Sequence, residues 1–76
     1  MKQYMLAQTG RYAFLLEAKE KKAAQAELKE AVEESLANCR ARFGSGTKHG
    51  TGDSYEITIG PDRRSALWTR LALVEV

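Results

Sequence analysis

The chain has 76 residues, one proline, one cysteine and a net charge of +2, from twelve basic and ten acidic side chains. This length leaves room for a single domain, 1–76, because a second hydrophobic core would have almost nothing to bury. With 43% hydrophobic residues, the composition is that of a globular domain rather than of a disordered chain. The single cysteine excludes an internal disulfide framework and favours a reducing compartment, so the expected localisation is cytoplasmic. The longest apolar runs, 12–16 and 71–74, are far shorter than the ~20 apolar residues of a membrane-spanning helix, so no membrane partner is expected.

Residues 1–17 fit two interpretations. As a β-hairpin they form strands over 3–8 and 11–17, joined by a turn at Thr9-Gly10. Half-buried strands alternate apolar and polar side chains, and the second strand does so at Tyr12, Phe14 and Leu16. As a helix, the same residues belong to one segment from 10 to 43, which is well above the mean helix length of ~11–12 residues. The hairpin is the favoured interpretation.

Residues 18–43 have the clearest secondary-structure pattern, that of an amphipathic helix. Apolar residues recur at steps of three and four and share one helix face: Ala24, Leu28, Val32, Leu36, Cys39 and Phe43. Arg40 and Arg42 stand in the last turn, where positive charge complements the helix dipole, and Gly44 is a suitable C-terminal stop. No Ser, Thr, Asp or Asn caps the N-terminal end.

Residues 44–54 contain four glycines among small polar residues, which predicts a loop. Glycine loops that hold phosphate usually lead from a strand into a helix N-terminus, whereas this loop leaves a helix C-terminus. It also lacks the Gly-Lys-Ser/Thr ending of a P-loop. We expect a flexible connector, with a binding loop that orders on a partner as the alternative.

Residues 55–76 predict a second hairpin. Tyr55, Ile57 and Ile59 alternate with polar residues, and Gly60-Pro61-Asp62-Arg63 suits a type I turn. The return strand runs over about 65–76 and ends in an apolar run that suits a strand covered on both faces. A register slip of one residue decides whether Trp68 or Leu67 shares a face with Ile57.

Together these elements predict an α+β fold with two layers, ββαββ. An antiparallel sheet of about four strands packs on one amphipathic helix and forms a single core. One helix covers one face of the sheet only. The opposite face is therefore the main structural clue to function.

Catalytic residue types are scarce, and we expect no enzyme, no cofactor and no metal site. The chain has one histidine, His49, and one cysteine, Cys39. Cys39 lies on the apolar helix stripe, where a small buried thiol is the common outcome. His49 and Asp53 would be two weak metal ligands with no third ligand nearby.

A protein partner is the favoured expectation. Tyr, Trp and Arg are enriched among the residues that dominate binding energy at interfaces, and a sheet face carrying Trp68 and Arg70, with Tyr55 in one of the two registers, could form a docking surface. The alternative, favoured for Trp68, is that these aromatic residues belong to the core, which a domain of this size needs. Arg63 and Arg64 on the predicted turn extend this candidate partner-binding set. A homodimer through an edge strand would cover exposed strand edges as well.

The alternative is a small nucleic-acid-binding protein. Basic residues are concentrated between Arg40 and Arg70, and phosphate contacts become plausible if the helix C-terminus and the second hairpin turn converge. The candidate phosphate contacts are Arg40, Arg42 and Lys48, joined by Arg63 and Arg64. No aromatic-rich strand typical of an RNA-recognition module is present.

The sequence thus favours a small non-enzymatic interaction module that binds and masks or regulates a protein partner. By analogy of size and chemical poverty alone, such modules are often accessory inhibitors encoded by phages and other mobile elements, anti-CRISPR proteins among them.

Overall fold

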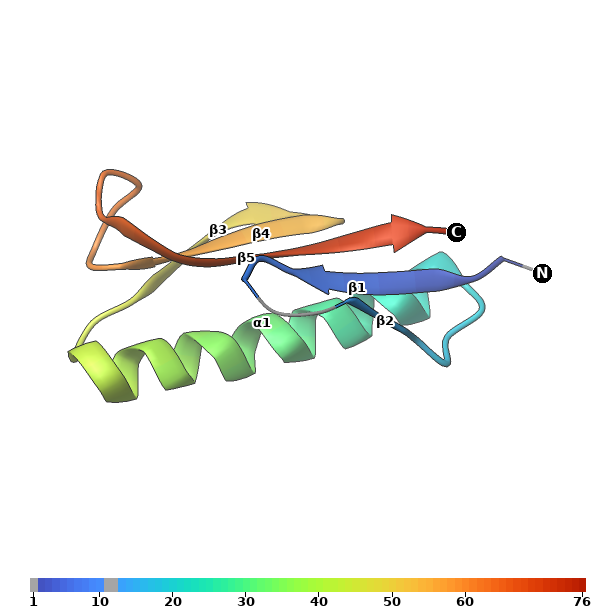
Figure 1. Ribbon diagram of the computed structural model, residues 1–76, viewed down its shortest axis with the longest axis horizontal. Coiled ribbons are helices and arrows are strands. Elements are labelled where there is room, and N and C mark those ends of the chain that lie inside the picture. The colour runs from blue at the N-terminus through green and yellow to red at the C-terminus, as the bar shows by residue number, and fades with distance from the viewer. Residues whose placement is uncertain (1, 11–12) are drawn as a thin grey trace.

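The computed structural model describes residues 2–10 and 13–76 and shows one helix packed on one antiparallel sheet (Figure 1). The elements in chain order are β1 (Tyr4–Gln8), β2 (Ala13–Leu15), α1 (Lys21–Phe43), β3 (Thr47–Thr51), β4 (Ser54–Ile59) and β5 (Ala66–Glu75). The five strands are ordered β2-β1-β5-β4-β3, so the first hairpin joins the second through the pairing of β1 with β5. α1 runs along one face of this sheet. The predicted α+β class with two layers is therefore confirmed.

The predicted ββαββ order with about four strands is only roughly matched, because the segment 44–54 contains a strand. β3 pairs with β4 in register from Thr47 opposite Thr58 to Thr51 opposite Ser54. A turn at Gly52 and Asp53 joins the two strands. The interpretation of 44–54 as a flexible connector was wrong. Polar, glycine-rich β3 has no apolar alternation to reveal it, since an edge strand is held mainly by its backbone ladder.

The helix is shorter than predicted at its start and matches the prediction at its end. It begins at Lys21 rather than near Ala18, after Glu20 in an extended conformation with no side-chain cap. Gly44 adopts a left-handed conformation (φ 76°), and its N–H donates to the carbonyl of Arg40 at 2.8 Å. This is the expected glycine C-terminus.

The predicted apolar stripe of the helix is the centre of the core. Five of its six members are buried, namely Ala24, Leu28, Val32, Leu36 and Cys39. Phe43, the sixth, is 47% exposed, so its predicted burial was wrong. The stripe packs on Ile57 of β4 and Leu71 of β5, which are both almost fully buried. Leu6 of β1 joins the same cluster.

The N-terminal hairpin was the correct choice over the long helix. Among the described residues, β1 begins at Tyr4 rather than at residue 3, and β2 ends at Leu15 rather than at residue 17. The predicted contribution of Tyr12 lies outside the described residues.

The second hairpin forms as predicted but departs from the prediction at its turn and at a bulge in β5. The turn hydrogen bond runs from the N–H of Ser65 to the carbonyl of Asp62 at 3.1 Å, two residues later than the predicted turn at 60–63. The carboxylate of Asp62 accepts the N–H of Arg64 at 2.9 Å. Aspartate side chains commonly accept a backbone N–H two residues on, and this interaction fixes the turn at Asp62 rather than at Gly60.

We predict that Gly50→Ala lowers the free energy of unfolding by about 1–3 kcal/mol, because a side chain there is both strained and obstructed. Gly50 has φ 122°, and an added Cβ would lie 2.3 Å from the backbone oxygen of Ser54. Urea unfolding measures the loss. The neighbouring exposed variant Thr51→Ala is the control and should stay within about 0.5 kcal/mol of the parent. Equal effects of the two substitutions would contradict the assigned conformation of β3.

Candidate functional site

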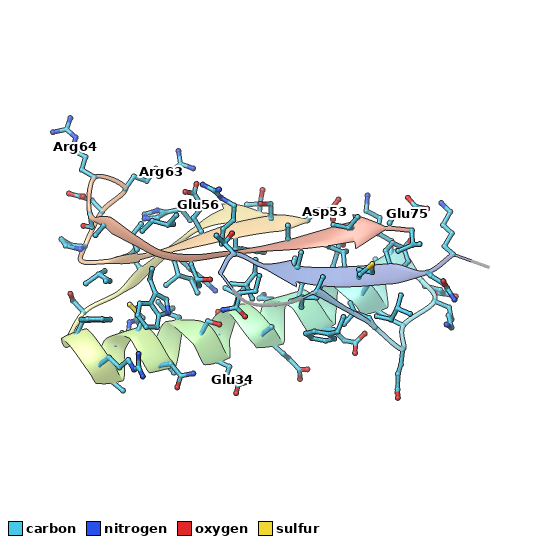
Figure 2. All side chains as sticks on the ribbon, in the orientation of Figure 1. Glu34, Asp53, Glu56, Arg63, Arg64 and Glu75 are labelled. Atoms are coloured by element: carbon cyan, nitrogen blue, oxygen red, sulfur yellow. The ribbon has the colours of Figure 1, made fainter. Side chains whose placement is uncertain are left out.

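The face of the sheet away from α1 has no helix over it (Figure 1), and the strand register identifies its residues. Successive side chains of a strand point to opposite faces. In β1, Tyr4 and Leu6 are buried against the helix layer, so Met5 and Ala7 point to the opposite face. Glu56 follows the same rule beside buried Ile57, and Figure 2 shows it on the side away from α1. We call this side the outer face.

One half of the outer face is apolar. Met5 stands opposite Leu15 of β2 on one side and Val74 of β5 on the other. Ala7 likewise stands between Ala13 and Ala72. Leu15 and Val74 are 58% and 46% exposed. These rows form a continuous surface across three strands, which we call the apolar outer surface: Met5, Ala7, Ala13, Leu15, Ala72 and Val74.

The other half of the outer face is polar. Glu56 of β4 and Arg70 of β5 are paired in register and form an ion pair at 3.1 Å. His49 of β3 stands opposite Glu56, with Nε2 3.3 Å from the hydroxyl of Thr58. The outer face therefore changes from apolar to charged along β5, between Ala72 and Arg70, which are neighbours on this face.

Trp68, Arg70 and Tyr55 do not share a face. Ile57 pairs with Thr69 and Thr58 with Leu67, so Trp68 is an extra residue of β5 in a β-bulge. Its ring meets the ring of Phe43 edge-on, with centroids 5.2 Å apart. Tyr55 also packs against the core, while Arg70 lies on the outer face.

The sequence left open whether Trp68 or Leu67 shares a face with Ile57. Trp68 lies on the helix side with Ile57, and Leu67 is 46% exposed. The bulge adds one residue to β5 at this point, so the side chains before it point to the opposite face from the one that regular alternation predicts. The sequence does not reveal where such an extra residue lies.

A groove of about 470 Å³ opens between α1 and the β1–β2 side of the sheet. Its apolar lining includes Leu6, Phe14 and Trp68, and its polar lining includes Gln8, Ser35 and Arg42. The guanidinium carbon of Arg42 lies 5.6 Å from the centre of the Trp68 ring. Trp68 therefore contributes to this groove rather than to a surface shared with Arg70.

The basic residues predicted to contact phosphate do not form one patch. Arg40 donates to the carbonyl of Gly46 at 3.1 Å, and Lys48 is bound to the carboxylate of Glu33. Arg63 and Arg64 lie on the β4–β5 turn and point away from α1 (Figure 2). The helix C-terminus and this turn lie at the same end of the molecule, but in different layers. Convergence of their side chains, the condition for a shared phosphate-binding patch, is therefore not seen.

Cys39 and His49 lie on opposite faces of the sheet. The thiol of Cys39 is buried in the core, 3.6 Å from the carbonyl of Ser45. His49 is on the outer face. Within residues 2–10 and 13–76, no group of three or more His, Cys, Asp or Glu side chains could hold a metal ion.

Two carboxyl groups on the β3 side of the fold have their pKa lowered by neighbours on other elements. The ammonium of Lys48 hydrogen-bonds to Glu33 and lowers the pKa of that carboxyl group. The side-chain amide of Gln25 donates to Asp53 at 2.8 Å and lowers the pKa of Asp53, with help from Lys21. These contacts connect α1 to the β3–β4 hairpin. The ammonium group of Lys48, a candidate phosphate contact, is therefore already paired with Glu33.

The surface that sequence reasoning missed is the group around Met5, Leu15 and Val74. The sequence did carry a signal for it, since β1, β2 and the end of β5 are apolar at successive positions. That pattern suggests strands covered on both faces. The structure leaves one of those faces open.

Comparison with known proteins finds no match to this chain among family models, curated proteins or solved structures. In the part of the chain that the structure describes, α1 is not apolar enough over a sufficient length to cross a membrane.

We predict that Lys48→Met raises the pKa of Glu33 towards its ordinary value, because the hydrogen bond that favours its charged form is lost. The pKa of Glu33 is lower in the folded chain than in the unfolded chain, so this pair contributes to stability above the unfolded pKa. The contribution is lost as the pH falls through the folded pKa. Titration of the carboxyl carbon of Glu33 by NMR measures its pKa in the folded parent and in the folded variant.

Asp53 is the internal control for this titration, because its pKa depends first on Gln25 rather than on Lys48. An unchanged Glu33 titration in Lys48→Met would contradict the ion pair.

Proposed function

We propose that this chain is a small non-enzymatic module that binds a protein partner through the outer face of its sheet. The observation that carries the proposal is the apolar outer surface, which continues across β2, β1 and β5 with no helix over it. Among the described residues, no element of the chain covers this surface. Contiguous exposed apolar patches on soluble proteins mark interaction sites more often than isolated apolar side chains do.

The border of this surface supports a protein partner as well. Arg70 and Glu56 form a partly exposed ion pair beside the apolar rows. A hydrophobic centre with a polar, charged rim is the usual anatomy of a protein interface. A partner with a matching apolar patch would bury Met5, Leu15 and Val74, while Arg70 and Glu56 would select the charges at its margin.

The candidate set of Trp68, Arg70, Tyr55, Arg63 and Arg64 needs revision under this proposal. Arg70 keeps its role at the margin of the surface, and Arg63 and Arg64 remain available on the turn. Trp68 and Tyr55 pack on the helix side, so substitutions there would alter the core before they altered binding.

The nucleic-acid alternative has weaker support. It needs several cations that converge on one surface to contact successive phosphates, whereas Arg40, Arg42 and Lys48 each have a neighbour within the chain. The proposal extends to protein binding alone, and a phage-encoded inhibitory or regulatory role has no support from the fold or the comparisons.

We predict that Val74→Lys weakens partner capture by about tenfold or more, because it places a charge within a surface that must lose its water on binding. The tagged chain is used to capture partners from a lysate of cells that encode it, with and without nuclease. Ala37→Lys is the matched control. It adds the same charge at an exposed position on α1, far from the outer face, and should capture the partner normally.

Two results would contradict the proposal. One is equal capture by the parent and a folded Val74→Lys variant, which would exclude the outer face as the binding surface. The other is loss of all capture on nuclease treatment, which would favour the nucleic-acid alternative. Thermal unfolding of each variant establishes that it is folded before capture is measured.

A further inference from the structure

β2 is an edge strand with an apolar composition and no protecting charge. Its three residues, Ala13, Phe14 and Leu15, are all exposed and all uncharged. It lies at the end of the sheet, so among residues 2–10 and 13–76 no strand pairs with its other side. Natural edge strands usually carry a charge, a proline or a bulge that prevents pairing with another chain. Among its described residues, β2 has none of these.

The hydrogen bonds around β1 establish which backbone groups of β2 face the open side. The N–H of Leu16 donates to the carbonyl of Tyr4 at 2.9 Å, so residue 16 faces β1. In an antiparallel pair the residues that face the neighbour alternate along the strand. Phe14, opposite Leu6, therefore also faces β1, whereas Ala13 and Leu15 direct their N–H and C=O groups away from it.

The other side of β1 supports this assignment. The N–H of Thr9 donates to the backbone carbonyl of Arg70 at 2.9 Å, and the N–H of Val76 donates to the backbone carbonyl of Gln3 at 2.8 Å. Odd-numbered residues at both ends of β1 thus face β5, which leaves the even-numbered residues, Leu6 among them, to face β2. The open edge of β2 therefore offers two donors and two acceptors, from Ala13 and Leu15.

We propose that two copies of this chain pair antiparallel through β2, about a two-fold axis at Phe14. In this register Ala13 of one copy stands opposite Leu15 of the other, and each such pair exchanges two N–H···O=C bonds. The two-fold axis repeats the pair, so all the open groups of Ala13 and Leu15 find partners. The inference goes beyond the proposed function and does not depend on it.

Side-chain sizes favour a second copy as the occupant of this edge. On the outer face, the small side chain of Ala13 lies opposite the large one of Leu15 in both cross-strand pairs, and such apolar pairs stabilise sheets. On the helix side, the two Phe14 side chains meet at the axis, where non-hydrogen-bonded residues approach most closely. Each copy thus places apolar side chains beside those of the other copy's edge strand.

The opposite edge of the sheet is less suited to this pairing. β3 carries Lys48, whose ammonium is bound to Glu33 of α1, and Gly50 in a conformation at φ 122°. A lysine on an edge strand opposes pairing with another strand. Dimerisation is therefore assigned to β2 and not to β3.

Pairing through β2 gives a ten-stranded sheet with both helices on the same side, because the two-fold axis is perpendicular to the sheet. α1 packs on β4, β5, β1 and β3 and, among the described residues, makes no close backbone approach to β2. The helices therefore stand back from the junction. On the other side, the two apolar outer surfaces become one continuous surface.

The oligomeric state of the full chain tests the proposal. Sedimentation equilibrium over a range of concentrations should show a species of twice the 8.5 kDa chain mass. Leu15→Pro removes a donor that faces only the open edge, so the fold keeps its internal bonds while the dimer loses two hydrogen bonds. Its dimer dissociation constant should rise at least about tenfold. Val74→Lys, on the same face but in a central strand, should leave the dimer intact.

Three results of that experiment would overturn the proposal: a monomer at every concentration, an unchanged dimer in Leu15→Pro, or a dimer lost in Val74→Lys. The last result would indicate that two outer faces stack on each other. Because Val74→Lys separates dimer from partner binding, failure of the dimer and failure of the proposed function give different results.

Cysteine cross-linking tests the register without relying on the proline variant. Phe14→Cys places two thiols at the axis, with Cα atoms about 4.5 Å apart, within the range of a disulfide. Leu15→Cys places them about 8 Å apart, which is too far. Mild oxidation should yield a covalent dimer with the first variant and at least about tenfold less with the second. The parent chain, with only buried Cys39, should yield none. Equal or greater cross-linking through Leu15→Cys would overturn the register.

Discussion

The packing of the α1 stripe on Ile57 and Leu71 is the interaction on which the remaining structure depends. It buries Leu28 and Val32 completely and aligns the helix with the centre of the sheet. In a domain of this size such burial supplies most of the favourable free energy of folding. Because there is one helix, the burial is available to one face only. The outer face, the edge strands and the groove are all consequences of this single contact.

The position of α1 over the sheet also explains why the two edges differ. At the β3 edge, Lys48 reaches Glu33 on the helix, and Asp53 in the β3–β4 turn accepts from Gln25. Polar contacts with the helix therefore secure that hairpin. At the β2 edge, the helix is further away, and a groove lined by Phe14 and Trp68 takes the place of direct packing. Phe14, which lies on the helix side of β2, remains partly exposed for this reason.

The parts of this fold that the sequence predicted are those where periodicity reflects burial on one side. The helix stripe from Ala24 to Cys39 and the alternation of Tyr55, Ile57 and Ile59 are of this kind. β3 was missed because its residues from Thr47 to Thr51 are held by backbone pairing, and their side chains carry no pattern. Local composition does not encode a backbone ladder, so a polar edge strand and a loop are alike in sequence.

The candidate site was only partly predictable, because the bulge in β5 reverses its alternation at Trp68. From the sequence, Trp68 and Arg70 are two residues apart and should share a face. The bulge moves Trp68 to the helix side, where it meets Phe43, and leaves Arg70 with Glu56 on the outer face. The uncovered face itself was foreseeable, because one helix is too few for a sheet with two faces. The apolar character of this face was not foreseeable, because Met5 and Val74 belong to strands whose sequences predict burial on both faces.

An exposed apolar surface has a cost that the chain must offset elsewhere. Leu15 and Val74 order water in the isolated domain and gain nothing from the core, although residues of this type contribute most when buried. Polar side chains at these positions would be equally compatible with the backbone pairing of β2, β1 and β5. The polar half of the same face demonstrates this, since His49, Glu56 and Arg70 occupy equivalent positions on β3, β4 and β5. Folding alone therefore gives no reason for Met5, Leu15 and Val74 to be apolar, whereas burial by another polypeptide does.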